Sequence, residues 1–227
     1  MSITYNKQFL SLINDLALIN KSVIIENKGD TVKISRSNPA QTIFYILTTK
    51  AENFQFSDDK IAFYDYSEFY RLLNVFDTPD LSISENKVTI SKDKSRIKYI
   101  ISDPETIQRG PEGVDFGECV VKFDLDSTDF KNLKKMISLL SSKYIKFTTN
   151  ENTINLNCFN NPNDNSFNKD LPMETTGESI SMKFSSEVFT LLPENNYTIE
   201  ISKKGIFKIL LVKDDIRFEV YVGEIED

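Results

Sequence analysis

One arrangement of residues occurs twice in this chain of 227 residues. Residues 67–73 read SEFYRLL, and residues 186–192 read SEVFTLL. Upstream of each stretch, four apolar residues share one spacing: Phe9, Leu12, Leu16 and Ile19 in the first copy, and Phe130, Leu133, Ile137 and Leu140 in the second. A repeat of this length is too long for a solenoid unit and is about the size of a small domain. Two α+β stretches can align by chance, but the shared order of four elements favours two similar domains.

Histidine is absent from the chain, which excludes imidazole acid–base chemistry, Ser-His triads and imidazole metal sites. The two cysteines, Cys119 and Cys158, lack metal-ligand spacing and are expected to be ordinary thiols in a reducing cytosol. No apolar run approaches about 18 residues, and no export signal precedes the first predicted helix. We therefore expect a cytoplasmic protein without a membrane span.

The residue types that catalysis needs are present but do not cluster. The 34 acidic residues are scattered among turns and strand positions, and Asp124 and Asp126 precede a predicted helix whose first turn they could cap. Residues 163–165 (NDN) resemble part of a calcium loop but lack its glycine and distal glutamate. Residues 110–113 (GPEG) neither follow a strand nor open a helix, as a phosphate cradle would. We therefore expect a scaffold or binding protein, with no enzymatic activity, metal or cofactor.

Apolar periodicity predicts an α+β protein rich in antiparallel strands. Strict alternation marks strands at 31–35, 87–91 and 216–222, each with one face toward a core. Asp65 followed by Glu68 predicts a helix N-cap, and Pro193 ends the last helix. Four helices are expected, two in each half and on one side of the sheets, near residues 6–21, 65–76, 128–143 and 185–192.

The outward faces of three predicted helices are neutral or basic, although the chain has a formal net charge of −7. Such segregation of charge is what attraction to a polyanion requires, but an ordinary solvated lysine face is the alternative. In the third helix, Phe130, Leu133, Ile137 and Leu140 form the apolar stripe. The core sets of the other two are Phe9, Leu12, Ile13, Leu16 and Ile19, and Phe69, Leu72, Leu73 and Phe76. The outward residues are Lys131, Lys134, Lys135, Ser138 and Ser142 on the third helix, Lys7, Asn14 and Lys21 on the first, and Ser67, Arg71 and Asn74 on the second.

Several stretches, in order, resemble one known family. They are 61–65 (IAFYD), Phe69 with 72–73, 81–84 (LSIS), 87–90 (KVTI), 97–104 ending in Asp-Pro, 154–160 (INLNCFN), Pro193 and 196–222. This series is similar to the DNA polymerase sliding clamps of large tailed bacteriophages of the T-even type, relatives of the cellular PCNA rings. A family relative has glycine at the position of Cys158. The resemblance covers nearly the whole chain, and the ordered set carries it rather than any single motif.

The resemblance implies two clamp-type domains, residues 1–103 and 119–227, joined by a connector at residues 104–118. Clamps close a ring of about six such domains, so a subunit of two domains implies a homotrimer with cyclic symmetry. Helices would line the hole and contact the phosphates of encircled duplex DNA without reading sequence. The DNA-facing residues would be Lys7, Lys21, Arg71, Lys131, Lys134 and Lys135. Asp65, Glu68 and Glu187 leave the second and fourth helices weakly charged, so the positive potential would come mainly from the first and third.

The implied function is processivity in DNA replication, without chemistry. An ATP-dependent clamp loader would place the ring on DNA, and a peptide from the polymerase tail would bind beside the connector. The pocket would use Ile206, Val220 and Val222, although each also fits plain sheet core. Two other classes stay open: a monomeric, non-ring nucleic-acid accessory module, and a carboxylate–metal enzyme, for which the sequence offers no clustered acidic site.

Overall fold

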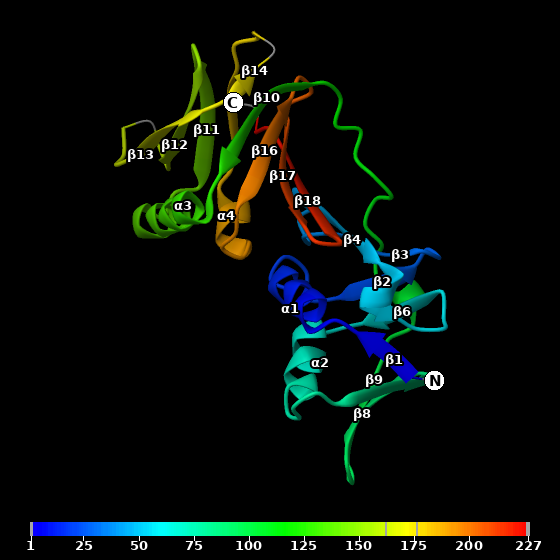
Figure 1. Ribbon diagram of the computed structural model, residues 1–227. Coiled ribbons are helices and arrows are strands. Elements are labelled where there is room, and N and C mark those ends of the chain that lie inside the picture. Colours follow the sequence, from blue (N-terminus) through cyan, green and yellow to red (C-terminus); the bar gives the residue numbers. More distant parts are fainter. Residues whose placement is uncertain (1, 162, 176, 226–227) are drawn as a thin grey trace. The chain divides into compact units, whose positions relative to one another are not determined.

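The computed structural model describes residues 2–161, 163–175 and 177–225 of the protein (Figure 1). Its contacts divide the chain into two compact units, each of which has two helices and antiparallel strands. Unit 1 comprises Met1–Gln41, Tyr45–Glu112 and Val212–Phe218, and unit 2 comprises Thr42–Phe44, Gly113–Leu211 and Glu219–Asp227. The domain limits expected from the sequence, 1–103 and 119–227, stay a prediction.

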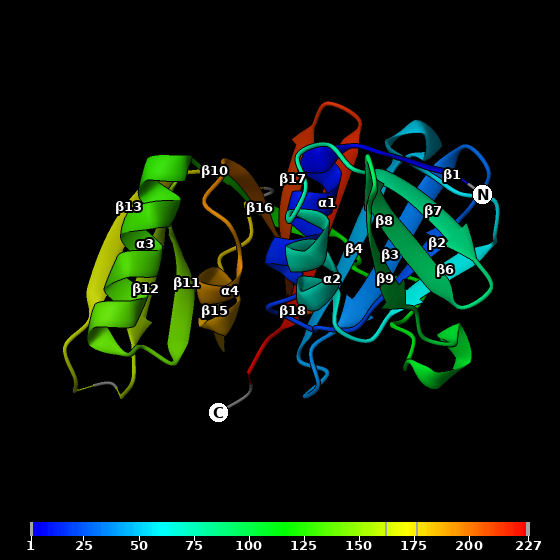
Figure 2. The same ribbon diagram turned by 90° about the horizontal axis from the view of Figure 1, so that it is seen from below.

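Unit 1 holds two helices and the strands of the first sequence copy. One sheet has the strand order β5-β1-β7-β8-β9, and β2 pairs with both β3 and β6. The helices α1 and α2 contact each other (Figure 2). The elements are β1 (Ser2–Tyr5), α1 (Lys7–Leu16), β2 (Val23–Asn27), β3 (Thr31–Ser37), most of β4 (Ile43–Lys50), β5 (Phe54–Gln55), β6 (Lys60–Phe63), α2 (Tyr66–Leu73), β7 (Asp80–Ser84), β8 (Lys87–Lys92) and β9 (Ser95–Ile100), with 3-10 turns at Ala51–Asn53 and Pro104–Thr106.

Unit 2 repeats the order of helices and strands along the chain. One sheet has the order β13-β12-β11-β15, and β10 pairs with β14 and β16, which in turn pairs with β17. Helix α3 contacts α4 and lies against β12. The elements are β10 (Cys119–Leu125), α3 (Ser127–Leu140), β11 (Tyr144–Asn150), β12 (Thr153–Phe159), β13 (Phe167–Pro172), β14 (Glu174–Thr175), β15 (Ser181–Ser185), α4 (Glu187–Leu191), β16 (Tyr197–Ser202), and most of β17 (Ile206–Lys213) and β18 (Ile216–Gly223).

Aromatic side chains fill both cores. In unit 1, the ring of Phe63 lies 4.5 Å from that of Phe69, and both are buried. In unit 2, the ring of Phe130 on α3 lies 4.8 Å from Tyr197. Tilted ring pairs of this kind add to the stabilisation from burial. The expected α+β class, with two helices and antiparallel sheets in each half, is confirmed.

The predicted helix starts are more accurate than the predicted ends. Asp65 caps α2, since its carboxylate accepts a hydrogen bond from the Glu68 N–H, and Asp126 caps α3 in the same way. Asp124 is not a cap, because it lies in β10 and accepts a hydrogen bond from the Thr198 hydroxyl. Within the described residues, no helix is long and apolar enough to cross a membrane.

All four predicted helices extend past the observed C-terminal ends. Helix α1 ends at Leu16, and the chain continues through i→i+3 turns in which the Leu18 N–H bonds to Asp15 and the Ile19 N–H to Leu16. Helix α3 ends at Leu140, because Ser141 adopts a left-handed conformation with φ of 50°. Helix α2 ends at Leu73, and α4 contains only Glu187–Leu191 before Pro193. Local caps are visible in a sequence, whereas these ends depend on tertiary packing.

Candidate functional site

Helix α3 carries the strongest basic face of the described helices. Phe130, Leu133 and Ile137 are buried, while Lys131 and Lys135 on the opposite side are exposed. Lys131 forms an exposed ion pair with Glu194 at 3.7 Å, which is worth little because water screens it. These two lysines are therefore available to an anionic partner.

Lys134, which flanks this face, is held by the protein itself. Its ammonium donates a hydrogen bond to the Leu192 carbonyl oxygen at 2.8 Å, and the side chain is partly buried. Lys134 therefore links α3 to the chain after α4, and part of its hydrogen-bonding capacity is used there. Its predicted role toward DNA stays a prediction, but Lys131 and Lys135 are the freer cations.

The end of α3 differs from the sequence interpretation. Ser142, expected to face outward, is buried because the left-handed Ser141 redirects the chain, and the Ser142 carbonyl accepts a hydrogen bond from the Ser186 hydroxyl. Leu140, expected in the core, is only partly buried, and Leu139 has 67% of its surface exposed. The basic face therefore ends at Ser138, which is exposed.

The cations of unit 1 are more dispersed. Lys7, in the first turn of α1, is exposed and lies 3.4 Å from Asp77. Lys21 follows the end of α1, and its ammonium lies 4.8 Å from the centre of the Tyr64 ring, a cation–π contact. Arg71 is exposed in the last turn of α2, whose first turn carries Glu68.

Three apolar residues expected in the cores of α1 and α2 are only partly buried. Leu12, Leu72 and Phe76 retain some exposure, whereas Leu10 is fully buried in place of Leu12. Phe76 lies beyond the end of α2, so the helical spacing does not fix its direction. Asn14, expected to face outward, is partly buried.

The chain just before the predicted connector and the first part of the connector are anchored to unit 1. The Ser102 N–H bonds to the Ala62 carbonyl of β6 at 2.9 Å, and Ile107 is buried against Ile24 and Ala62. Further along, the Ser35 hydroxyl donates to the Pro111 carbonyl at 2.6 Å, and the Lys33 ammonium donates to the Glu112 carbonyl at 2.7 Å. Both side chains come from β3, so residues 110–112 lie along this strand, whereas Ile107 packs against β2 and β6.

Gly110 is required by this close approach. A methyl group at its Cα would lie 2.7 Å from backbone atoms of Ser35 and Arg36, closer than carbon atoms in proteins approach backbone. Gly113 has open space around the same position. Gly110, the first glycine of the GPEG segment, therefore allows the backbone of the connector to pack closely against β3.

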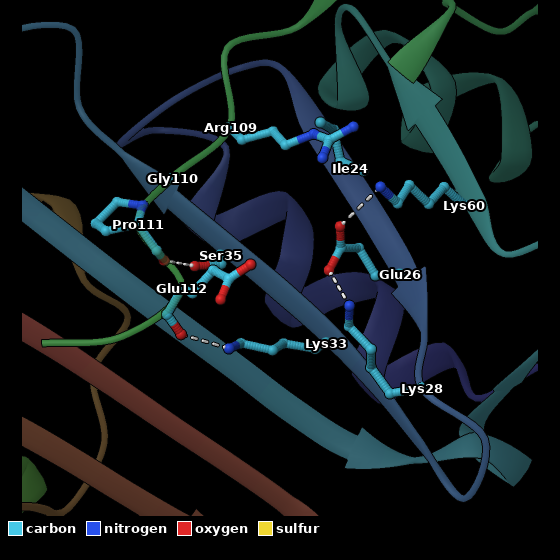
Figure 3. Close-up of a pocket in the computed structure, with 10 residues that line it drawn as sticks. All are labelled: Ile24, Glu26, Lys28, Lys33, Ser35, Lys60, Arg109, Gly110, Pro111 and Glu112. Atoms are coloured by element: carbon cyan, nitrogen blue, oxygen red, sulfur yellow. Dashed lines mark hydrogen bonds and ion pairs between the residues drawn. The ribbon is translucent and has the colours of Figure 1, made fainter. Parts of the chain in front are cut away.

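A cavity of about 390 Å³ lies beside this anchored segment; we call it the connector groove (Figure 3). Glu26 stands within it, 2.9 Å from the Lys28 ammonium and 3.5 Å from that of Lys60. Burial raises the pKa of Glu26, but the hydrogen bonds and charges of Lys28 and Lys60 outweigh burial, so its pKa lies below the ordinary value. The lining residues are Ile24, Glu26, Lys28, Lys33, Ser35, Lys60, Arg109, Gly110, Pro111 and Glu112.

The next part of the connector packs within unit 2 through Phe116. Its ring lies edge-on to Tyr221 at 6.2 Å, Tyr221 stacks on Phe44 at 6.0 Å, and the Lys208 ammonium lies 4.7 Å from the Phe116 ring. Lys208 also pairs with Glu200, and the two side chains are only 12% and 17% exposed. We call Phe44, Phe116 and Tyr221 the aromatic cluster.

An exposed ion pair lies beside the aromatic cluster. Asp115 pairs with Lys204, whose hydrogen bond and charge lower the pKa of the Asp115 carboxyl. Gly117 follows with φ of 77°, a left-handed conformation that glycine adopts without strain.

No protein-family model matches the chain, and no curated protein matches it. Solved structures do match it along nearly its whole length. The PCNA of Entamoeba histolytica superposes with a TM-score of 0.80 at 11% identity, with 99% of each chain covered. The PCNA of Thermococcus kodakaraensis gives 0.77 at 16% identity, also with 99% of each chain covered. The PCNA of A. fulgidus, in a structure with the C-terminal region of FEN-1 bound, gives 0.77 at 13% identity and covers 100% of this chain and 99% of its own.

The chain has the fold of PCNA. The structural superpositions establish the fold. At identities of 11–16%, they do not assign a role to any residue of this chain. The part of the sequence resemblance that concerns a PCNA-like clamp fold is therefore confirmed.

Within this PCNA fold, the three residues predicted for a partner pocket have different exposures. Val220 and Val222 on β18 are 0% and 2% exposed, whereas Ile206 at the start of β17 is partly exposed. Tyr221 lies between the two valines in β18. Because successive strand residues point to opposite faces, its side chain points away from theirs and contacts Phe116 and Phe44. Of the three predicted residues, Ile206 alone offers surface to a partner in this structure, and the pocket stays a prediction.

Sequence reasoning missed the aromatic cluster and the connector groove. Phe116 is an isolated aromatic in a segment of glycines and prolines, and no periodicity identifies its partner. The alternation of β18 does signal that Tyr221 faces away from Val220 and Val222. The groove brings together residues from β2, β3, β6 and the connector, a proximity that only the fold reveals.

Proposed function

We propose that this protein is a DNA sliding clamp, a ring that encircles duplex DNA and tethers the replicative polymerase as its processivity factor. The observation that carries the proposal is the match to the PCNA fold over at least 99% of both chains. In this proposal the protein has no enzymatic activity. Its function is to remain on DNA while a bound polymerase does the chemistry.

Ring closure would use unpaired sheet edges. Among the described strands, β9 ends the five-stranded sheet of unit 1 and β13 ends the four-stranded sheet of unit 2. Ile100 on β9 is 62% exposed, and exposed edge strands with apolar residues invite pairing. The exposed cations Arg96 and Lys98 on β9 are matched by the opposite charge of the exposed Asp170 on β13. We infer head-to-tail pairing of β9 with the β13 of a neighbouring subunit, which closes a homotrimer.

The helices would line the hole of this ring. Lys131 and Lys135 on α3 supply most of the positive charge, and Lys7, Lys21, Arg71 and Lys134 add to it. Contacts would go to phosphates, often through water, because base-specific hydrogen bonds would stop sliding. Retention would come from the closed ring, so the lysines need only centre the duplex.

The partner-peptide site would lie in unit 2 beside the connector. A peptide from the polymerase tail would place an apolar or aromatic side chain near Ile206, with Val220 and Val222 supporting the pocket from the core. A PCNA with the same fold has the C-terminal region of FEN-1 bound, which supports the idea that this architecture receives such peptides. An ATP-dependent clamp loader would open the ring for loading.

The origin and setting of the protein are further parts of the proposal. The ordered similarity of residues 61–104 to T-even-type clamps supports a bacteriophage source. The protein would then act in the cytoplasm of the host cell.

A threading experiment tests the proposal without a clamp loader. Linear duplex DNA is tethered to a bead at one end, the protein is added at micromolar concentration, and the free end is then blocked with streptavidin. We expect protein to remain through a wash in high salt and to leave when a restriction enzyme cuts the duplex, because a ring is held by topology and electrostatic binding is not. Loss of all protein in the salt wash, with both ends still blocked, would contradict the clamp.

A further inference from the structure

The connector groove on unit 1 concentrates positive charge in an acidic protein. Among the described residues, four cations line it, Lys28, Lys33, Lys60 and Arg109, against two carboxylates, Glu26 and Glu112. The cations come from four segments of the chain, so their convergence is a product of the fold (Figure 3). A local excess of cations in a chain of net charge −7 favours an anionic ligand.

The cations of the groove retain hydrogen-bonding capacity. The Lys33 ammonium donates one hydrogen bond, to the Glu112 carbonyl, and an ammonium has three hydrogens. Arg109 pairs with the exposed Glu105 and is itself half exposed, so its planar group has further donors to offer. Lys28 and Lys60 already hold the carboxylate of Glu26, which shows that this geometry receives a carboxylate.

The lining also restricts the chemical class of the ligand. None of the described residues that line the groove is aromatic, so a nucleobase would find no ring on which to stack. Its apolar lining is confined to Ile24, which is 4% exposed, and Pro111. A volume of about 390 Å³ exceeds what a single carboxylate fills and is at the low end of the usual range for ligand sites.

We propose that the connector groove binds an acidic peptide segment of a partner protein, through two or more Asp or Glu side chains. Lys33 and Arg109 are the principal contacts, and Lys60 and Lys28 add charge from the far side. The groove shares no residue with the partner pocket of the proposed function, since Ile206, Val220 and Val222 belong to unit 2 and do not line the groove. The proposal therefore stands whether or not the protein forms a ring.

Binding would also brace the connector. Arg109 belongs to the connector, and Lys33 already holds the Glu112 carbonyl, so a ligand that contacts both side chains joins the connector to β3. The bond between Arg109 and Gly110 is a trypsin site in an exposed segment. A bound acidic peptide should slow cleavage there.

The test uses the full-length protein and fluorescent hexaglutamate, with hexaglutamine as the uncharged probe. We expect hexaglutamate to bind and hexaglutamine not to bind, and binding to weaken as salt increases. Lys33→Ala and Arg109→Ala should each weaken binding about tenfold, the effect of losing one charge-assisted hydrogen bond. Lys94→Ala removes the same charge from an exposed position on the β8–β9 turn of unit 1 and should leave binding unchanged. Hexaglutamate should also protect the bond after Arg109 from trypsin.

Three results would overturn the proposal. The first is equal binding of hexaglutamate by wild type, Lys33→Ala and Arg109→Ala, which would place the peptide elsewhere. The second is equal binding of hexaglutamate and hexaglutamine. The third is tripolyphosphate binding that is tighter than that of hexaglutamate and is abolished in the same two variants, which would assign the groove to phosphate ligands instead.

Discussion

The helix pairs of the two units share an order but differ in charge and length. In unit 2, α3 has 14 residues and presents Lys131 and Lys135 on one exposed face, while α4 has five residues and carries Glu187. In unit 1, α1 has 10 residues and α2 has eight, and each has a single exposed cation, Lys7 and Arg71. The repeat therefore preserves packing but concentrates charge in one helix.

This difference shows that core packing and surface charge constrain the sequence separately. The buried aromatics at the start of both copies, Phe9 and Phe130, occupy the same place in the order of elements, because each unit needs its own core. Surface charge has no such requirement, and it is uneven. We infer that the core determines the fold of each unit equally, whereas α3 dominates the attraction to DNA in the proposed ring.

The largest expected effect tests the equality of the two cores. Phe9→Ala and Phe130→Ala each remove a ring that is 0% exposed, and each should lower the free energy of unfolding by about 3–5 kcal/mol. Chemical denaturation measures both changes. A decrease of less than about 1 kcal/mol in one variant, with the full decrease in the other, would show that the two units are not packed alike.

Gly110 and Gly113 of the connector allow the backbone packing of the two units to be compared. In unit 1, Gly110→Ala places a methyl group 2.7 Å from the backbone of β3, so the free energy of unfolding should fall by about 1–3 kcal/mol. In unit 2, Gly113→Ala meets open space and should change it by less than about 0.5 kcal/mol. Equal effects in the two variants would contradict the anchoring of residues 110–112 on β3.

Charge reversal tests the inequality of the two helix pairs. Lys131→Glu with Lys135→Glu should leave folding unchanged and reduce the salt slope of DNA association by about 0.9 for each phosphate that the variant no longer neutralises. Lys7→Glu should have a smaller effect, because Lys7 already lies beside Asp77. The matched control, Lys92→Glu with Lys94→Glu, changes the same charge at the end of β8 and on the β8–β9 turn. DNA association by the α3 variant equal to that of this control would remove α3 from the DNA-facing surface.

The smallest expected effect concerns the helix caps. Asp65→Ala and Asp126→Ala each remove the acceptor for one N–H in the first turn, and each should lower the free energy of unfolding by about 1 kcal/mol. Asp124→Ala is the control in unit 2, since Asp124 lies in a strand and accepts an exposed hydrogen bond from the Thr198 hydroxyl. A cost for Asp124→Ala as large as that for Asp126→Ala would contradict the assignment of the cap.

Sequence reasoning succeeded where the determinants are local. The carboxylates of Asp65 and Asp126 mark helix starts because the N–H groups they accept from are three residues away. The alternation in β3 and β8 follows from one buried face. The same reasoning placed Ser142 outward, because it assumed that the helix continues past the left-handed Ser141.

The candidate sites depend on contacts that no local pattern contains. Lys134 looked like a free lysine, but it bonds to the carbonyl of Leu192, far away in the chain. Phe116 meets Tyr221, and Ser35 meets Pro111, only after the sheets have formed. For this reason the helix lysines could be predicted from spacing, whereas the groove and the aromatic cluster could not.

The molar mass of the protein in solution tests the central claim most directly. Light scattering or sedimentation equilibrium at micromolar concentration should give three times the monomer mass of 26.1 kDa, because the proposed pairing of β9 with the β13 of a neighbour would close a ring of three subunits. A mass of 26.1 kDa at that concentration, or a two-fold symmetric dimer, would contradict the ring and favour a non-ring accessory module with the same fold.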